Sequence, residues 1–244
     1  VSKLLGHLNY DCQTCARLTG AAEFVARMDI DLSECLEEVS ALRTLRDVFE
    51  RRIRYWETRP MPADRASVVS PADSRMIVGS FSETSSLFVK NKFFSLPELL
   101  GFNTGWADHF SEGSFAVFRL TPDKYHYNHL PVSGIVLDHY QITGSYHSCN
   151  PGVLISMAGP ASRNRRVVTI IDTDVEGGSG AGMVAMVEVA ALMIGDIVQA
   201  YSETAYDSPE DIRRGSFLSK GQPKSLYHPG SSTDILVFEE GRID

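Results

Sequence analysis

The sequence beyond Pro62 alternates between short runs of β-branched and aromatic residues and clusters of glycine, proline, asparagine and serine. Runs of this length and composition are typical of strands joined by turns. The predicted strands are Ser114–Leu120, Gly134–Ile142, Arg166–Asp172, Met183–Val189 and Asp234–Phe238. One short helix interrupts them, with Ser95 as its N-cap, Glu98 completing a capping box and Gly101 ending it. Because long helices do not alternate with the strands, we predict a largely antiparallel sheet.

The first quarter of the chain is predicted to be helical. An apolar residue recurs at every third or fourth position, which places one apolar stripe along a helix. The stripe consists of Leu32, Leu36, Val39, Leu42, Leu45, Phe49, Ile53 and Trp56. The pattern allows a break into two helices near residues 40–44, and Pro60 ends it. The predicted fold class is therefore α+β, with an N-terminal helical region over 1–60 and a β-rich domain over 61–244.

The charge balance excludes one class of partner. With 31 acidic and 23 basic residues, the formal net charge is −8, whereas a general nucleic-acid binder needs a basic face. The longest apolar stretch, residues 183–198, is interrupted by Glu188 and Asp196, so no segment is predicted to span a bilayer. The first twenty residues do not have a signal-peptide pattern. The sequence begins with Val1. A natural N-terminus that has been trimmed, together with a membrane anchor, therefore stays an open alternative.

Two segments resemble ligand-binding motifs, but each lacks residues that the motif requires. The glycine-rich segment 177–182 lacks the Lys-Ser/Thr pair of a P-loop, and Met183 stands where a dinucleotide motif needs glycine. We interpret it as a loop between two strands. Cys12 and Cys15 have CxxC spacing, but no second pair of ligands follows at zinc-finger distance. Structural thiols are therefore favoured over a redox or half-metal site.

The histidines carry more information. Four of the seven lie between residues 126 and 147, and His126 and His129 bracket an aromatic residue and an amide. Pro131 follows, which indicates a loop entering a strand rather than a metal-binding helix. No nearby set of carboxylates or cysteines completes a metal site, so we predict none. The two histidines are interpreted either as structural or as acid–base residues.

Six segments, taken in order, resemble the motifs of one enzyme family. They are Arg43–Arg52 with Arg59-Pro60, Ser70–Asp73, Phe94–Gly101, Phe118–Pro122 with Tyr125–Gly134, Asn164–Val167, and Lys220-Gly221 with Gly230–Thr233 and Phe238. Together they resemble the phosphatidylserine decarboxylase family of pyruvoyl enzymes over residues 20–240. The chain departs from these motifs at Lys124, Tyr127 and Ser74, and in the segment 227–231.

The resemblance implies a cofactor made from the chain itself. Decarboxylation of an amino acid needs an electron sink that no ordinary side chain provides. In the family, a serine hydroxyl attacks the preceding carbonyl, and the cut chain carries a pyruvoyl group at its new N-terminus. Alignment of the family's longer motif through Phe238 makes Ser232 that serine and also matches Thr233. A count of the shorter motif from Lys220 makes it Ser231, so we favour Ser232, with cleavage near 231/232.

The resemblance also implies the roles of three further residues. His129 would deprotonate Ser232 during self-cleavage, and Asp73 would orient His129. His126 would protonate the substrate after CO2 leaves. The predicted catalytic set is Ser232 or Ser231 with His129, His126 and Asp73.

The leading interpretation is a zymogen of a decarboxylase that converts phosphatidylserine to phosphatidylethanolamine. An apolar stripe from Leu4 onward, with Lys3, Arg17 and Arg27 nearby, either lies on a lipid surface or packs against the β body. The alternatives are a relative that decarboxylates a soluble amino acid and an uncleaved, catalytically silent binding protein. We expect a cytoplasmic location, with peripheral membrane contact and a homodimer as open alternatives. The expected partner is phosphatidylserine or a small amino acid, and no nucleic acid.

Overall fold

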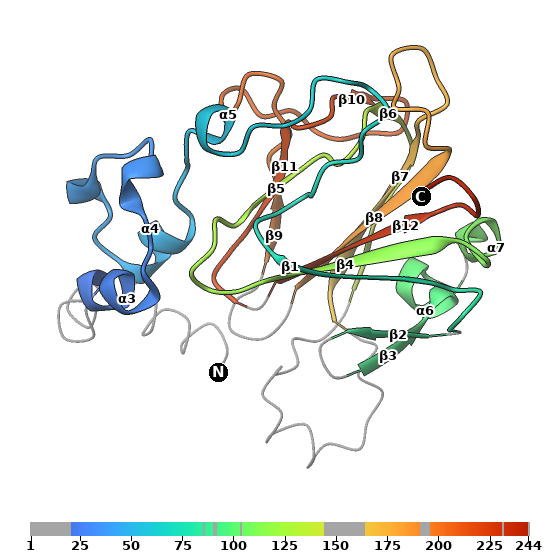
Figure 1. Cartoon of the computed structure of the whole chain (residues 1–244), viewed down its shortest axis with the longest axis horizontal. Coiled ribbons are helices and arrows are strands. Elements are labelled where there is room, and N and C mark those ends of the chain that lie inside the picture. The colour runs from blue at the N-terminus through green and yellow to red at the C-terminus, as the bar shows by residue number, and fades with distance from the viewer. Residues whose placement is uncertain are drawn as a thin grey trace.

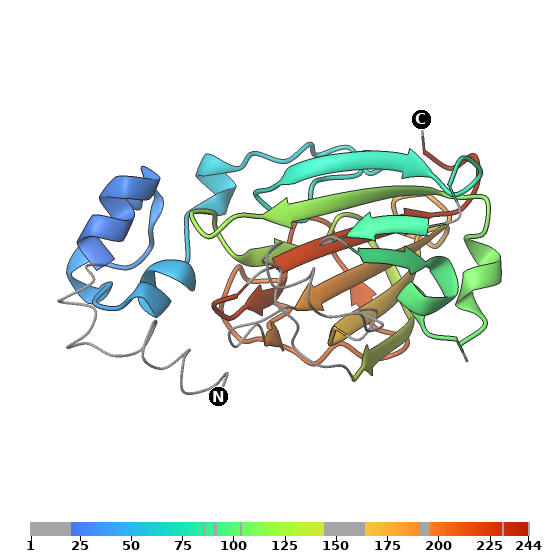
Figure 2. The same cartoon turned by 90° about the horizontal axis from the view of Figure 1, so that it is seen from below.

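The structure is a computed structural model that describes residues 21–84, 86–89, 92–102, 104–143, 164–190, 196–230 and 232–243. The helices near the N-terminus lie to one side of a body built of strands (Figures 1 and 2). Three predicted features fall outside the described residues: the pair Cys12 and Cys15, the stripe beginning at Leu4, and Ser231.

A seven-stranded sheet forms the body, in the order β1-β4-β12-β8-β7-β6-β10 (Figure 1). Its strands are β1 (Arg75–Ser80), β4 (Ser114–Leu120), β6 (Gly134–Ile142), β7 (Arg166–Asp172), β8 (Met183–Ala190), β10 (Phe217–Leu218) and β12 (Ser232–Phe238). Every pairing in this sheet is antiparallel. The predicted α+β class is therefore confirmed. Four predicted strands agree to within one residue, and the last begins two residues earlier than predicted, at Ser232.

The central strands are apolar on both faces because the sheet lies between two cores. Successive side chains of a strand point to opposite faces, and in β8 the side chains of Met186 and Val187 belong to different buried clusters. Leu236 and Ile235 of β12 divide in the same way. Burial on both faces explains why these strands are continuous apolar runs rather than alternating ones.

A second, smaller sheet has three antiparallel strands in the order β5-β11-β9. They are β5 (Tyr127–His129), β9 (Ile197–Gln199) and β11 (Pro223–Tyr227). The local sequence around Pro131 predicts a loop, but pairing with β11, far later in the chain, makes Tyr127–His129 a strand. A tertiary contact thus overrides the local signal. The predicted loop over residues 177–182 does join two strands, β7 and β8.

The short helix within the β body forms as predicted. It is α6 (Leu96–Leu100), which follows the hairpin of β2 (Ser86–Val89) and β3 (Lys92–Ser95) and precedes α7 (Trp106–His109). The Ser95 side chain accepts from the backbone N–H of Glu98, and the Glu98 carboxylate accepts from the backbone N–H of Ser95. Gly101 ends the helix at φ 94°, a conformation that glycine adopts without strain.

The prediction of a long N-terminal helix is wrong in its extent. The chain forms α3 (Ala21–Met28), η2 (Leu32–Glu34), η3 (Val39–Ala41), α4 (Leu45–Phe49) and α5 (Tyr55–Thr58). The break near residues 40–44 occurs as allowed, because Thr44 and Asp47 form a capping box that starts α4. A second break follows at Ile53, which forms an isolated antiparallel bridge with Cys35. None of the described helices is long and apolar enough to cross a bilayer.

Candidate active site

Ser232 is the first residue of β12. In the sheet it lies opposite Leu120 of β4 and Ala190 of β8. The residue is 1% exposed, and its hydroxyl has no hydrogen-bond partner in the described part of the chain. A buried polar group without a partner costs about 1–3 kcal/mol. Among the described residues the Ser232 hydroxyl is therefore not held by a structural hydrogen bond, and it is available for chemistry.

His126 is fully buried, and its ring stacks on Phe49 with ring centroids 3.5 Å apart. Its Nδ1 lies 2.7 Å from the carbonyl oxygen of Lys124. Because a carbonyl only accepts, Nδ1 carries the proton and Nε2 a lone pair. Burial lowers the pKa of His126 to about 3, so the ring is neutral at pH 7. Like the Ser232 hydroxyl, Nε2 is buried without a hydrogen-bond partner among the described residues.

One apolar cluster connects these two unpartnered atoms. Phe49, Leu120 and Ala190 are members of the same buried cluster. Phe49 stacks on His126, while Leu120 and Ala190 flank Ser232 on the two neighbouring strands. The structure therefore brings the predicted nucleophile and the first predicted histidine to the border of one water-excluding cluster.

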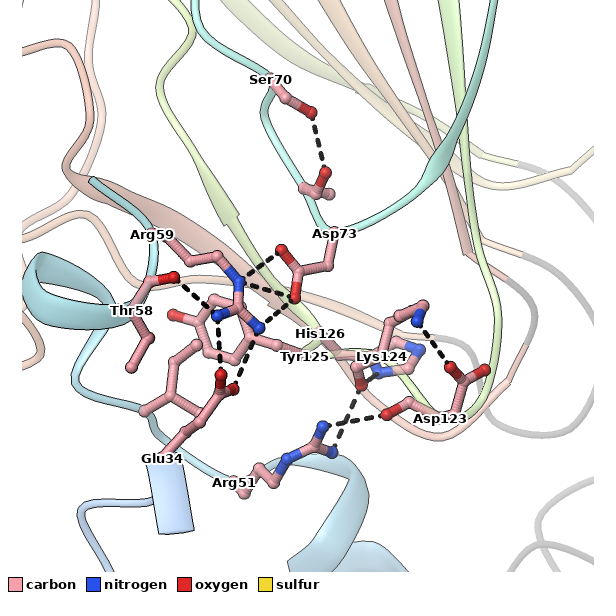
Figure 3. A network of polar contacts seen from close by, with 12 residues as sticks. Glu34, Arg51, Thr58, Arg59, Ser70, Asp73, Asp123, Lys124, Tyr125 and His126 are labelled. Atoms are coloured by element: carbon pink, nitrogen blue, oxygen red, sulfur yellow. Dashed lines mark hydrogen bonds and ion pairs between the residues drawn. The ribbon is translucent and has the colours of Figure 1, made fainter. Parts of the chain in front are cut away.

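Arg51, from the helical region, holds the turn that precedes His126 (Figure 3). Its buried guanidinium donates to the carbonyl oxygens of Asp123 at 2.9 Å and Lys124 at 3.3 Å. The Lys124 carbonyl also accepts from Nδ1 of His126. By fixing this shared acceptor, Arg51 orients the imidazole and determines which nitrogen is free.

His129, the second predicted histidine, has both ring nitrogens engaged. Its Nδ1 donates to the carbonyl oxygen of Gly221 at 2.8 Å. Its Nε2 therefore accepts, and the Tyr125 hydroxyl lies 3.0 Å from it. Burial lowers the pKa of His129 to about 4, so the ring is neutral, as a base must be. The lone pair that would accept a serine proton is nevertheless bound to Tyr125.

Asp73 does not make the predicted contact with His129 within the described structure. Its carboxylate binds the guanidinium of Arg59, with Nε at 2.9 and 3.0 Å and Nη2 at 2.8 Å (Figure 3). Arg59 also binds both carboxylate oxygens of Glu34, at 2.9 and 3.0 Å. Arg59 thus bridges two acids and holds Asp73 away from a direct hydrogen bond with the histidine.

A cavity of about 500 Å³ lies where these groups meet. Arg59, Asp73, Tyr125 and His129 give it a polar side. The apolar walls come from Pro60, Met61, Pro62, Val68, Val69, Pro71 and Ala72. Ala72 also packs against the apolar cluster that flanks Ser232, so the cavity adjoins the nucleophile's surroundings. The described side chains include no group of three or more His, Cys, Asp or Glu that could hold a metal ion.

Sequence reasoning missed the partners that orient the predicted residues. Arg51, Arg59 and Tyr125 stand inside the matching motifs but received no role. Glu188 was noted only because it interrupts an apolar run. A single acid in a strand that is otherwise apolar is itself a signal, because a buried carboxylate needs compensating donors.

Comparison with known proteins shows the family of this chain. The sequence pattern of the family described as phosphatidylserine decarboxylase matches residues 45–244. The phosphatidylserine decarboxylase proenzyme of Bordetella petrii is 31% identical over 255 residues, which cover 100% of this chain and 85% of that protein. The proenzyme of the same name from Chlamydia trachomatis is 32% identical over 221 residues, covering 90% and 67%. The chain therefore belongs to the phosphatidylserine decarboxylase family, whose members are pyruvoyl-dependent carboxy-lyases.

Proposed function

We propose that this chain is the precursor of an enzyme that converts phosphatidylserine to phosphatidylethanolamine. The observation that carries the proposal is the unpartnered Ser232 hydroxyl, which borders the same cluster as the unpartnered Nε2 of His126. Buried polar atoms are usually hydrogen-bonded. Other buried atoms of the described residues, such as the Thr233 hydroxyl, also lack a partner, but these two belong to residues that the family motifs predict to be catalytic. The names of the similar proteins, which are phosphatidylserine decarboxylase proenzymes, supply the reaction.

Self-cleavage would begin at Ser232. Its Oγ attacks the carbonyl carbon of residue 231, and the amide becomes an ester as the nitrogen of residue 232 takes up a proton. Loss of the Cα proton then breaks the Cβ–Oγ bond, and residue 231 leaves as a carboxylate. Water replaces the nitrogen of residue 232, which departs as ammonia and leaves a pyruvoyl group at the head of residues 232–244.

The residues around Ser232 fit a small group of this kind. Leu120 and Ala190 flank it, and the hydroxyl is not committed to any other described group. The pyruvoyl carbonyl supplies the electron sink that decarboxylation needs. His126 holds its free Nε2 at the border of the same cluster and would exchange a proton there with the substrate carbon.

His129 is the proposed base for self-cleavage. Its neutral ring is in the form that accepts a proton, and Nδ1 is fixed by Gly221. For Nε2 to receive the proton of Ser232, the hydroxyl of Tyr125 has to give up its place. Asp73, which lines the same cavity as His129, would orient the ring once released from Arg59.

The shape of the cavity favours a lipid over a free amino acid. Its largely apolar walls suit the glycerol and first acyl carbons of a phospholipid, while its polar side suits a charged headgroup. Trp56, which is 50% exposed, precedes the cavity residue Thr58 by two positions. An exposed aromatic side chain this close in sequence to a cavity residue supports peripheral contact with the cytoplasmic face of a membrane.

Intact-mass analysis of the purified chain tests this function. We expect two fragments, residues 1–231 and 232–244, with a pyruvoyl group on the shorter one, and a single full-length chain for Ser232→Ala. Ser231→Ala is the matched control and should still be cut. A single intact mass for the unaltered chain would favour the silent binding protein. Release of CO2 from free serine, but not from phosphatidylserine vesicles, would favour the relative acting on a soluble amino acid.

A further inference from the structure

A fully buried ion pair joins the two sheets. Glu188 belongs to β8 of the seven-stranded sheet and Lys224 to β11 of the three-stranded sheet. Nζ of Lys224 lies 2.5 Å from Oε2 of Glu188, and both side chains are 0% exposed. Burial alone would raise the pKa of Glu188, but the Lys224 ammonium and the hydrogen bonds from neighbouring side chains hold that pKa below its ordinary value. The carboxylate is therefore ionised in the interior.

Each strand of the small sheet contributes a donor to this one carboxylate. From β5, Nδ2 of Asn128 donates to Oε1 of Glu188 at 3.2 Å. From β11, Ser225 donates to Oε1 and Lys224 to Oε2. From β9, Nε2 of Gln199 donates to Oε2 at 3.2 Å. Glu188 is thus a single polar anchor for all three strands.

This anchor lies next to both halves of the candidate site. Asn128 is the middle residue of β5; His129 follows it in the strand, and His126 directly precedes the strand. Glu188 precedes Ala190 by two positions in β8, and Ala190 lies opposite Ser232. The bond from Asn128 to Glu188 therefore connects the strand that carries His129 with the strand that flanks the nucleophile.

Stability alone does not explain the arrangement. The desolvation cost of a buried ion pair often cancels its Coulomb attraction, and apolar replacements of similar volume are frequently neutral or stabilising. The ion pair instead fixes the relative position of the strands. A carboxylate with several donors is fully hydrogen-bonded in one arrangement only, whereas apolar surfaces can shift against each other. A displacement of only about 1 Å at a reacting group can slow a reaction by about 100-fold.

We propose that Glu188 and Lys224 are positioning residues that, through Asn128, fix the histidine-bearing strand relative to Ser232 and thereby set the rate of self-cleavage. This inference rests on the proposed function. It assigns no chemical step to Glu188, Lys224 or Asn128, and no contact with the substrate.

Two matched variants test the inference. Asn128→Leu and Gln199→Leu each remove one amide donor from Glu188, but only Asn128 lies on the strand that carries His129. We expect Asn128→Leu to slow self-cleavage about tenfold or more in a timed cell-free synthesis, and Gln199→Leu to change it less than about threefold. Equal rates for the two variants, at similar melting temperatures, would overturn the inference.

The double variant Glu188→Leu/Lys224→Met tests the ion pair itself. It leaves the donors of Asn128, Ser225 and Gln199 without their acceptor, so we expect a lower melting temperature. In protein that is still folded at the assay temperature, we expect self-cleavage to slow about tenfold or more. A stable double variant that is cut at the original rate would contradict the inference. If it does not fold, the comparison of Asn128→Leu with Gln199→Leu still decides.

A readout without cleavage keeps the inference distinct from the proposed function. In uncut Ser232→Ala protein, the ring nitrogens of His126 and His129 can be observed by NMR. We expect Asn128→Leu to shift the His129 and His126 signals, and Gln199→Leu to leave them in place. Unchanged signals in both variants would reject the positioning role. Failure of the unaltered chain to cut itself would reject the proposed function and leave this measurement valid.

Discussion

The hydroxyl of Tyr125 lies 3.0 Å from Nε2 of His129, on the nitrogen whose lone pair a serine proton would need. The same hydroxyl lies 2.6 Å from the hydroxyl of Tyr206, which in turn lies 2.9 Å from the carbonyl oxygen of Ile53. The one proton of Tyr206 serves one of these two acceptors at a time. In the uncut chain the proposed base is thus already hydrogen-bonded. Whether Nε2 of His129 can accept a proton therefore depends on how readily the Tyr125 hydroxyl breaks this hydrogen bond.

Removal of this competitor should accelerate self-cleavage. Tyr125→Phe keeps the buried ring but frees Nε2 of His129, so we expect cleavage to be about three- to tenfold faster, in line with the loss of one neutral hydrogen bond of about 1 kcal/mol. The rate would be followed on a denaturing gel after cell-free synthesis. Slower cleavage would instead assign Tyr125 to proton transfer. Tyr201→Phe, which removes a hydroxyl outside this network, is the control.

Release of Asp73 from Arg59 should affect the stability of the fold and the rate of self-cleavage differently. Arg59→Met removes the cation shared by Asp73 and Glu34 and leaves two acids close together, so we expect a lower melting temperature. If Asp73 orients His129, the same variant should be cut at least as fast as the unaltered chain, whereas Asp73→Asn should be cut more slowly. A parallel fall of stability and cleavage in both variants would show that the ion pair only supports the fold.

The stacking of Phe49 on His126 should matter for chemistry beyond its packing. Phe49→Leu leaves a partial cavity beside His126, and we expect a loss of about 1–3 kcal/mol in the free energy of unfolding together with slower decarboxylation. Phe110→Leu is the matched control, because Phe110 is equally buried in another cluster. The two variants should lose similar stability, and only the first should lose turnover. Equal turnover would leave the stack with a packing role alone.

Stability should fall with acid because the two histidines are buried neutral. The pKa values of His126 and His129 are lowered by burial to about 3 and about 4, below the 6.5 of an ordinary histidine. Protonation therefore favours the unfolded chain, so this stability is complete above pH 6.5 and is lost as the pH falls toward 4 and then 3. Urea unfolding of uncut Ser232→Ala protein between pH 7.5 and 4.5 measures this loss. Adding His126→Leu should flatten the dependence, and an unchanged slope would mean that other groups cause it.

The same shifts predict how self-cleavage depends on pH. A base with a pKa of about 4 stays neutral well below pH 6. We therefore expect the cleavage rate to stay nearly constant between pH 8 and pH 5.5, where an ordinary histidine would become protonated. A fall in rate centred near pH 6.5 would exclude a fully buried His129 as the base.

The sequence predicted what is encoded locally and missed what depends on distant partners. The main strands and the capped helix around Ser95 follow from side-chain period and capping, and both are present. The strand Tyr127–His129 depends on pairing with β11, which no local pattern around Pro131 reveals. The predicted long helix fails for a similar reason, because a cap at Thr44 competes with its apolar stripe.

The same distinction holds for the candidate site, where the motifs predicted the residues but not their contacts. The motifs located Ser232, His126, His129 and Asp73, and the structure places the last two on one cavity. They did not reveal that Asp73 is bound to Arg59, because hydrogen-bond partners are chosen in three dimensions. The positions of residues in a motif predict which groups are near one another, and the contacts between them have to be read from the fold.

The place of β12 in the sheet has a consequence for the mature molecule. β12 lies between β4 and β8 and is hydrogen-bonded to both along its length. A cut before Ser232 would convert this strand into a separate short peptide that remains threaded through the interior of the other fragment. The two pieces would travel together in gel filtration and part only in denaturant. Once parted, they would have to meet again by diffusion, so unfolding of the cut protein would be far harder to reverse than unfolding of the precursor.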